Sequence, residues 1–327
     1  MLLNTQRKGR HVDRARDQRA SKMQRIAGLS DNLWGAILMT AGMAAFIAND
    51  TFLKLLGADL PLFQILMLRS IVTVVLLAGL CHYFKAWRFR LKGRDRWVIL
   101  ARSMTDVGAS YFFLTGLFNM PIANATSILQ VMPLVVALGG VLFFKERLGP
   151  RRLIAIVIGF GGMLLILRPG VEGYGFYSFY VLVAVFFVTA RDLLTRLLSS
   201  EVPSLMVTFF NALAILIYSS LAMLWFDWVA VSTQNVLYIG AASALISAAY
   251  LLSVLVMRIG EIGFIAPYRY TSLIWALLSG FLVFGHWPDV WTLLGACIIV
   301  GSGVFVMWRE LATAPTSTPH SQPRNPD

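Results

Sequence analysis

The chain has 327 residues, of which 58% are hydrophobic and 13% are charged, and its mean hydropathy is +0.72. So much apolar surface exceeds what one soluble core can bury, so the composition excludes an ordinary soluble domain and indicates a protein covered by lipid. The formal net charge of +12 does not indicate a nucleic-acid partner, because the basic residues stand in a tail and in short loops rather than in a stripe on a soluble fold.

The chain begins with a basic tail, residues 1–32, that we expect on the cytoplasmic side, either solvated or lying on anionic lipid as an interfacial helix. It does not resemble a cleavable signal peptide, because the apolar stretch that follows is longer than a signal core and contains Asn49 and Asp50. We therefore expect that stretch to remain as the first membrane span.

After the tail, the sequence predicts an all-α integral membrane protein, because ten stretches have the roughly 20 apolar residues needed to cross a bilayer. The predicted spans cover residues 33–56, 62–84, 97–118, 122–144, 151–168, 174–195, 204–226, 235–258, 263–285 and 289–308. Prolines stand in the short connections, as at Pro121, Pro203 and Pro288. Residues 309–327 are rich in Pro, Ser and Thr and are predicted to be disordered.

The distribution of basic residues predicts the orientation. Most of the 28 Lys and Arg residues stand in the N-terminal tail and in the connections that alternate with it, whereas Lys54 and Arg168 stand on the opposite side. Basic residues near span ends are retained in the cytoplasm. We expect both termini to be cytoplasmic, in a membrane of the bacterial inner-membrane type.

The chain contains an internal repeat. Residues 48–61 (ANDTFLKLLGADLP) align with residues 190–203 (ARDLLTRLLSSEVP). The alignment pairs Asp50 with Asp192 and Lys54 with Arg196. A second register pairs Glu146, Ala155 and Gly162 with His286, Gly295 and Ser302. A period near half the chain indicates two duplicated halves, and an odd number of spans in each makes the halves inverted relative to one another.

Three segments resemble the drug/metabolite transporter superfamily, in particular its ten-helix EamA-type members. They are PLVVALGGVLFFKERLG at 133–149, GFGGMLLILRP at 159–169 and APYRYTSLIWALLSGFLVFGHWPD at 266–289. The resemblance implies two inverted five-helix repeats, 33–168 and 174–308, around a central cavity that carries small metabolites by alternating access. His286 replaces the glutamate usual in the family; it is either a pH sensor at the outer mouth or a polar loop residue without a special role.

Four charged residues within the spans are candidates for coupling or gating, because a charge in hydrocarbon is costly unless it has a partner or a function. Asp50 and Arg69 are expected at similar depth as a pair, which either locks two spans together or acts as a gate. Arg102 and Asp106 are four residues apart on one helix, so we expect an ion pair. Asp106 is then either the proton-coupling carboxylate or half of a static pair.

Arg269 is the main candidate for substrate binding, because no acid lies three or four positions away on its predicted helix. Its planar guanidinium suits a carboxylate or phosphate group. The alternatives are an ion pair with Asp106 or Asp192, or a contact with lipid headgroups. Gln130 is its approximate counterpart in the first repeat. Aromatic residues on spans that line the cavity by resemblance are further candidates: Tyr111, Tyr250, Tyr268, Tyr270 and Trp275.

The small residues of the spans at 151–168 and 289–308 predict a close helix contact, either within the chain or at a homodimer surface. No cofactor is implied, since the sequence contains no Walker A motif, and Cys81 and Cys297 indicate neither a disulfide framework nor a metal site. We expect a secondary transporter of an amino-acid-like, carboxylate-bearing or S-adenosylmethionine-like solute. Drug efflux by the same fold, an intramembrane enzyme acting on lipid and a non-transporting scaffold are the alternatives.

Overall fold

The computed structural model describes residues 31–89, 91–145, 149–167, 175–199, 201–256 and 265–313. These residues form helices joined by short turns, with no strand in any of the described ranges. The two predicted tails lie almost wholly outside the described residues, as do Glu146 and Arg168. The prediction of an all-α protein is confirmed.

The helices follow the predicted spans closely. The first described helix is Asp31–Leu56, and it is followed by α2 (Leu62–Tyr83), α3 (Gly93–Asn119), α4 (Ile122–Leu129), α5 (Met132–Phe144), α6 (Pro150–Leu167), α7 (Gly175–Thr195), α8 (Ser204–Ala222), α9 (Thr233–Val256), the 3-10 helix η3 (Ala266–Tyr270), α11 (Thr271–Phe284) and α12 (Val290–Thr313). Seven helical segments in the described ranges are long and apolar enough to cross a membrane. The chain is therefore a multi-pass membrane protein.

Two of the predicted spans are interrupted. The segment 122–144 divides into α4 and α5 at Gln130 and Val131, next to Pro133 in the first turn of α5. Proline has no N–H for the helical ladder, which explains a break at this point. The segment 263–285 contains η3 in place of regular α-helix, with Pro267 in its first turn.

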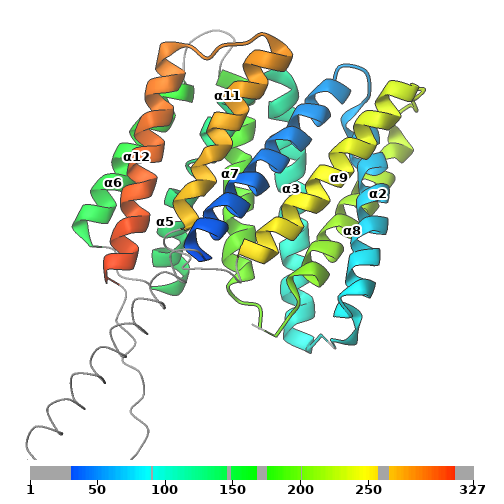
Figure 1. The fold of residues 1–327 in the computed structure, drawn as a ribbon, viewed down its shortest axis with the longest axis horizontal. Coiled ribbons are helices and arrows are strands. Elements are labelled where there is room, and N and C mark those ends of the chain that lie inside the picture. Colours follow the sequence, from blue (N-terminus) through cyan, green and yellow to red (C-terminus); the bar gives the residue numbers. More distant parts are fainter. Residues whose placement is uncertain are drawn as a thin grey trace, which may run out of the picture.

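The helices pack in pairs across the two halves of the chain. Helix α3 lies along α7, α6 along α12, and α2 along α8. The first helix contacts α9 through the rings of Phe46 and Tyr250, whose centroids are 5.8 Å apart, and those of Phe52 and Tyr238, 5.4 Å apart. Figure 1 shows that the first helix begins, and α12 finishes, at the same end of the bundle.

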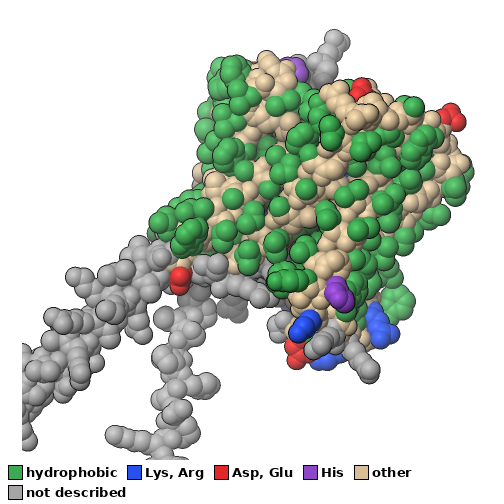
Figure 2. All heavy atoms as spheres, turned by 45° about the vertical axis from the view of Figure 1, so that its right-hand side comes forward, with side chains coloured by type: hydrophobic (Ala, Val, Ile, Leu, Met, Phe, Trp, Pro, Cys, Tyr) green, Lys and Arg blue, Asp and Glu red, His purple; other side chains and the backbone are tan. Residues whose placement is uncertain are grey.

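The two ends of the bundle differ in charge. In Figure 2, Lys and Arg side chains gather at one end, below a broad apolar band. We call this end the basic end, and the opposite end the outer end. The basic end contains the α2–α3 and α7–α8 connections, which are joined by the Lys92–Glu201 ion pair of 3.1 Å. Large apolar side chains around the band are widely exposed, such as Leu142 at 76% and Leu282 at 74%. Lipid is the medium that fits such a surface.

Glycines allow α6 and α12 to approach closely. A Cβ atom on Gly162 would lie 2.9 Å from the main-chain oxygen of Gly295, and one on Gly295 would lie 2.5 Å from the main-chain oxygen of Gly162. Only residues without a side chain permit this backbone contact. The predicted close contact of these two spans is confirmed, and it lies within the chain.

Replacing Gly295 by valine is expected to destabilise the bundle by about 1–3 kcal/mol, because main-chain atoms cannot move aside as a flexible side chain can. Thermal unfolding of the detergent-solubilised variant checks this expectation. Gly301→Val is the matched control on the same helix, since a Cβ atom there meets no atom within 4 Å. Equal unfolding temperatures for the two variants would contradict the close crossing.

Candidate functional site

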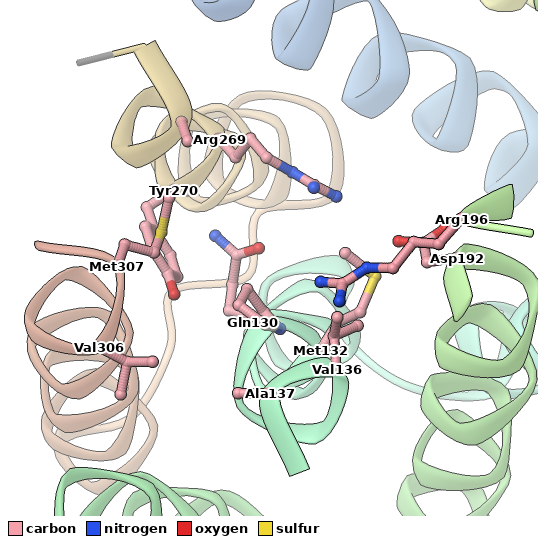
Figure 3. A pocket seen from close by; sticks show the side chains of 12 residues that line it. Gln130, Met132, Val136, Ala137, Asp192, Arg196, Arg269, Tyr270, Val306 and Met307 are labelled. Atoms are coloured by element: carbon pink, nitrogen blue, oxygen red, sulfur yellow. The ribbon is translucent and has the colours of Figure 1, made fainter. Parts of the chain in front are cut away.

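A cavity of about 160 Å³ lies in the basic half of the bundle, between α5, α7, η3 and α12. Its polar lining comes from the α4–α5 break, the end of α7 and η3, and its apolar lining from α5 and α12. The lining residues are Gln130, Met132, Pro133, Val136, Ala137, Asp192, Arg196, Ala266, Arg269, Tyr270, Val306 and Met307. Figure 3 shows Gln130, Arg196 and Arg269 turned toward the space between these elements.

The two interrupted spans place the polar groups. Gln130 is the C-terminal cap of α4, directly before the break, and Arg269 and Tyr270 end the 3-10 turn that precedes α11. The Nε2 atom of Gln130 and the hydroxyl of Tyr270 are buried without a hydrogen-bond partner among the described residues. A buried polar group without a partner costs about 1–3 kcal/mol. Such atoms beside a cavity are typical of a site that receives a ligand.

The lining carries more positive than negative charge. Arg196 and Arg269 contribute two guanidinium groups, and Asp192 contributes the one carboxylate of the described lining. That carboxylate is already paired, because Arg191 approaches its Oδ1 atom to 3.0 Å. Arg269 is solvent-exposed and forms no ion pair with an acid in the described ranges. The cavity therefore favours an anionic or acceptor-rich group.

A buried polar network lies behind the cavity and joins α3, α7 and α8. Asp106 accepts hydrogen bonds from Arg191 at 3.1 Å and from the Nδ2 atom of Asn211 at 2.7 Å. The Oδ1 atom of Asn211 in turn accepts a hydrogen bond from Ser103 at 2.9 Å. Because Arg191 bonds both Asp106 and Asp192, it connects the buried carboxylate to the cavity wall.

The outer half of the bundle is packed instead of hollow. Helix α4 contacts α11 there, and a Cβ atom on Gly280 would lie 3.5 Å from Ile122. The buried side chains of Leu53, Leu56 and Leu117 fill the space nearby. The described cavity thus lies in the basic half, whereas these contacts close the space between α4, α11 and the first helix in the outer half.

The sequence comparisons agree with this architecture. Residues 33–168 match the EamA-like transporter family. The chain is 27% identical over 285 residues to a riboflavin transporter of Vibrio cholerae, covering 85% of this chain and 93% of the relative. It is 24% identical over 266 residues to an S-adenosylmethionine uptake transporter of Rickettsia bellii, covering 80% and 89% of the two chains. The first half of the chain thus matches the EamA-like transporter family, and most of the chain is similar to transporters of small metabolites.

A solved crystal structure shares the fold of this chain. The two align with a TM-score of 0.57 at 18% identity, over 85% of this chain and 98% of the other. The family match and the two relatives are all transporters and not enzymes, and they support a transporter of small metabolites. The described residues contain no group of three His, Cys, Asp or Glu side chains that could hold a metal ion.

Two predicted ion pairs, Arg102–Asp106 and Asp50–Arg69, are not formed in the structure. Arg102 does not bond Asp106; its Nε donates to the Thr195 hydroxyl at 2.7 Å, because Arg191 and Asn211 already occupy both carboxylate oxygens. Asp50 and Arg69 interact electrostatically but form no direct ion pair.

Asp50 instead accepts a hydrogen bond from Asn49 at 2.9 Å. The Nε atom of Arg69 is buried without a partner in the described part of the chain. Asp50 and Arg69 therefore lie near each other in a buried region without a direct contact.

The candidate aromatic residues do not share one place. Tyr270 lines the cavity together with Arg269 and Gln130. Tyr111 stacks on Phe63 with a centroid distance of 6.0 Å, and Trp275 packs against the hydrophobic core. Tyr250 lies close to the Asp106 network.

Arg196 and Asp192 belong to the cavity lining, yet their signal in the sequence was indirect. The sequence indicates Asp192 as a possible partner for Arg269 and Arg196 as an aligned basic residue of the repeat, but it assigns neither residue to the site. Both are the repeat counterparts of residues in the first half, Asp50 and Lys54. Charged residues that occur twice at equivalent positions were the clue that could have identified them.

Proposed function

We propose that this EamA-type protein carries its solute by alternating access between two inverted five-helix repeats, residues 33–168 and 174–308. The helix pairing supports the symmetry: α3 against α7 is the counterpart of α9 against the first helix. The two interrupted spans, at Gln130 and at η3, are also repeat counterparts. Inverted repeats with broken helices at the binding site are a common design of secondary transporters.

We further propose that the basic end faces the cytoplasm of a bacterial inner membrane and that both termini lie on that side. The charge difference between the two ends supports this orientation. With a hollow basic half and a packed outer half, the structure then corresponds to an inward-facing state.

The observation that carries the substrate proposal is the convergence of Arg269, Gln130 and Tyr270 on one cavity with excess positive charge. These groups suit a solute with carbonyl, imide or carboxylate oxygens. Riboflavin offers such oxygens without a positive charge. S-adenosylmethionine carries a sulfonium and an ammonium group that Arg269 would repel. The site therefore favours the riboflavin-like solute of the two that the relatives' names suggest.

The size of the cavity indicates that the bound state is more open. Pockets for drug-sized ligands measure about 300–1,000 Å³, whereas this cavity measures about 160 Å³. A solute of riboflavin's size fits only if α5 and η3 move apart. Each of these elements begins next to a proline and a break in the helix, which provides a place for bending.

We propose that Asp106 couples transport to protons, with Arg102, Asp50 and Arg69 as the charged groups around it. Arg191 supports this role because it bonds both Asp106 and the cavity carboxylate of Asp192. A proton on Asp106 would weaken its bond to Arg191 and leave that guanidinium to Asp192 alone. The charge beside the cavity would then change with the protonation of a buried group.

The test is a flux assay on purified protein in proteoliposomes, with labelled riboflavin, S-adenosylmethionine and a set of monocarboxylates, each with and without an inward proton gradient. We expect riboflavin to cross faster than S-adenosylmethionine and faster than in protein-free vesicles. Flux of S-adenosylmethionine alone would overturn the substrate assignment. Absence of flux for every solute would overturn the proposed transport site and favour a scaffold role.

A further inference from the structure

Lys54 joins three elements at the closed outer end. It stands in the last turn of the first helix, and its Nζ donates to the main-chain oxygens of Leu117 at 2.6 Å and Met120 at 2.8 Å. The same ammonium group lies 5.6 Å from the ring centroid of Phe284, the last residue of α11. One side chain thus connects the first helix, the end of α3 and the end of α11.

The chemistry of this contact depends on the end of a helix. The last four carbonyls of α3 have no partner within the helix and form its negative pole, and α3 has no basic residue in its own last turn. Lys54 supplies the missing cation from another element. Lys54 is half-buried and has no ion pair with an acid in the described ranges. Its hydrogen bonds to the end of α3 exist only while the first helix and α3 stay together.

Neighbouring contacts lie on the same seam. The hydroxyl of Thr51, one turn earlier on the first helix, hydrogen-bonds that of Ser279 on α11. A Cβ atom on Gly57 would lie 2.8 Å from the ring of Phe118, so the chain after Lys54 lies tightly against the end of α3. Separation of the first helix from both the end of α3 and α11 would break all these contacts together.

We propose that Lys54 is a gating residue that holds the outer end of the transporter closed in the inward-facing state, through its bonds to the end of α3 and its contact with Phe284. The proposal rests on the alternating access proposed above. Opening toward the outer side requires the first helix to part from the end of α3 and from α11, and the Lys54 contacts must break for that movement.

The internal repeat supports a role in gating. Arg196 is the repeat counterpart of Lys54, yet it lines the cavity at the opposite, hollow end. Equivalent cations therefore have different surroundings in one structure, one at a closed end and one at an open end. Inverted repeats that exchange their conformations during transport produce this asymmetry.

The test measures how fast a reporter cysteine beneath Lys54 reacts with a membrane-impermeant maleimide added to the outside of intact cells. The reporter is Thr51→Cys, a position only 8% exposed, in a background with Cys81→Ala and Cys297→Ala. In Lys54→Met we expect labelling to be roughly tenfold faster. The substitution removes hydrogen bonds that a charged group makes only in the closed state, so the open state, in which the cysteine reacts, is populated more. Lys54→Arg should keep the slow rate, since it retains the charge and the donors.

Ala58→Cys, at an exposed position on the outer end, controls for reagent access and should react quickly in every background. Lys54→Gln serves as a second variant if Lys54→Met does not accumulate. Labelling of Thr51→Cys at the wild-type rate, in a variant that elutes as a single folded species, would overturn the gating role. The assay needs no solute, so failure of the flux assay and failure of this proposal are separate results.

Discussion

Replacing Arg269 by alanine is expected to reduce solute flux at low concentration at least tenfold while membrane expression stays at the wild-type level. A charge-assisted hydrogen bond contributes about 1.5–3 kcal/mol, so loss of one bond to the solute is sufficient for this effect. Expression should not change because Arg269 is exposed and forms no ion pair in the described structure. Initial rates in proteoliposomes, normalised to reconstituted protein, check the prediction.

Two further variants make the Arg269 result specific. Arg269→Lys keeps the charge but loses the planar pair of donors, so an intermediate rate is expected. Arg94→Ala removes an exposed arginine from the start of α3, outside the cavity, and should leave flux unchanged. A wild-type rate in Arg269→Ala would remove this residue from the binding site.

Replacing Asp106 by asparagine is expected to make transport insensitive to an imposed proton gradient and to lower thermal stability. The amide imitates a protonated carboxyl group, so the proposed coupling step is fixed in one state. The variant also breaks the buried pair with Arg191, whose atoms are 3.1 Å apart. Loss of one partner from a buried pair costs about 3–5 kcal/mol. Flux with and without the gradient, together with thermal unfolding, measures both effects.

The Asp106 prediction separates coupling from structure. A purely structural role predicts lower stability, with the remaining flux still accelerated by the gradient. That outcome would leave Asp106 as a fixed link between α3, α7 and α8 and would contradict its coupling role. Asp59→Asn, at an exposed carboxylate on the outer end, is the control and should change neither property.

The span positions were predictable because they depend on local composition. The predicted span 62–84 corresponds to Leu62–Tyr83 in the structure, since hydrophobic length and a preceding proline determine both ends. The α6–α12 contact was also predictable, because small residues recur at equivalent repeat positions of the two spans, Ala155 with Gly295 and Gly162 with Ser302. The repeat further related Gln130 to Arg269, and both residues line the same cavity.

The partners of the buried charges were not predictable from spacing within one helix. Arg102 and Asp106 satisfy the rule for side chains four residues apart, but Asp106 bonds Arg191 and Asn211 on two other helices. Similarly, Lys54 stands out in the sequence only as an isolated cation. Its bonds to the end of α3 depend on which helix termini meet in space.

The claim that the transported solute binds between Gln130 and Arg269 is tested most directly by solute protection of a cysteine in the cavity wall. Ala137→Cys, on the α5 side of the cavity, would be labelled with a maleimide from the cytoplasmic side of inside-out vesicles, with and without saturating riboflavin. We predict that riboflavin slows labelling severalfold and that Arg269→Ala abolishes this protection. Unchanged labelling, in vesicles that transport riboflavin, would contradict the account.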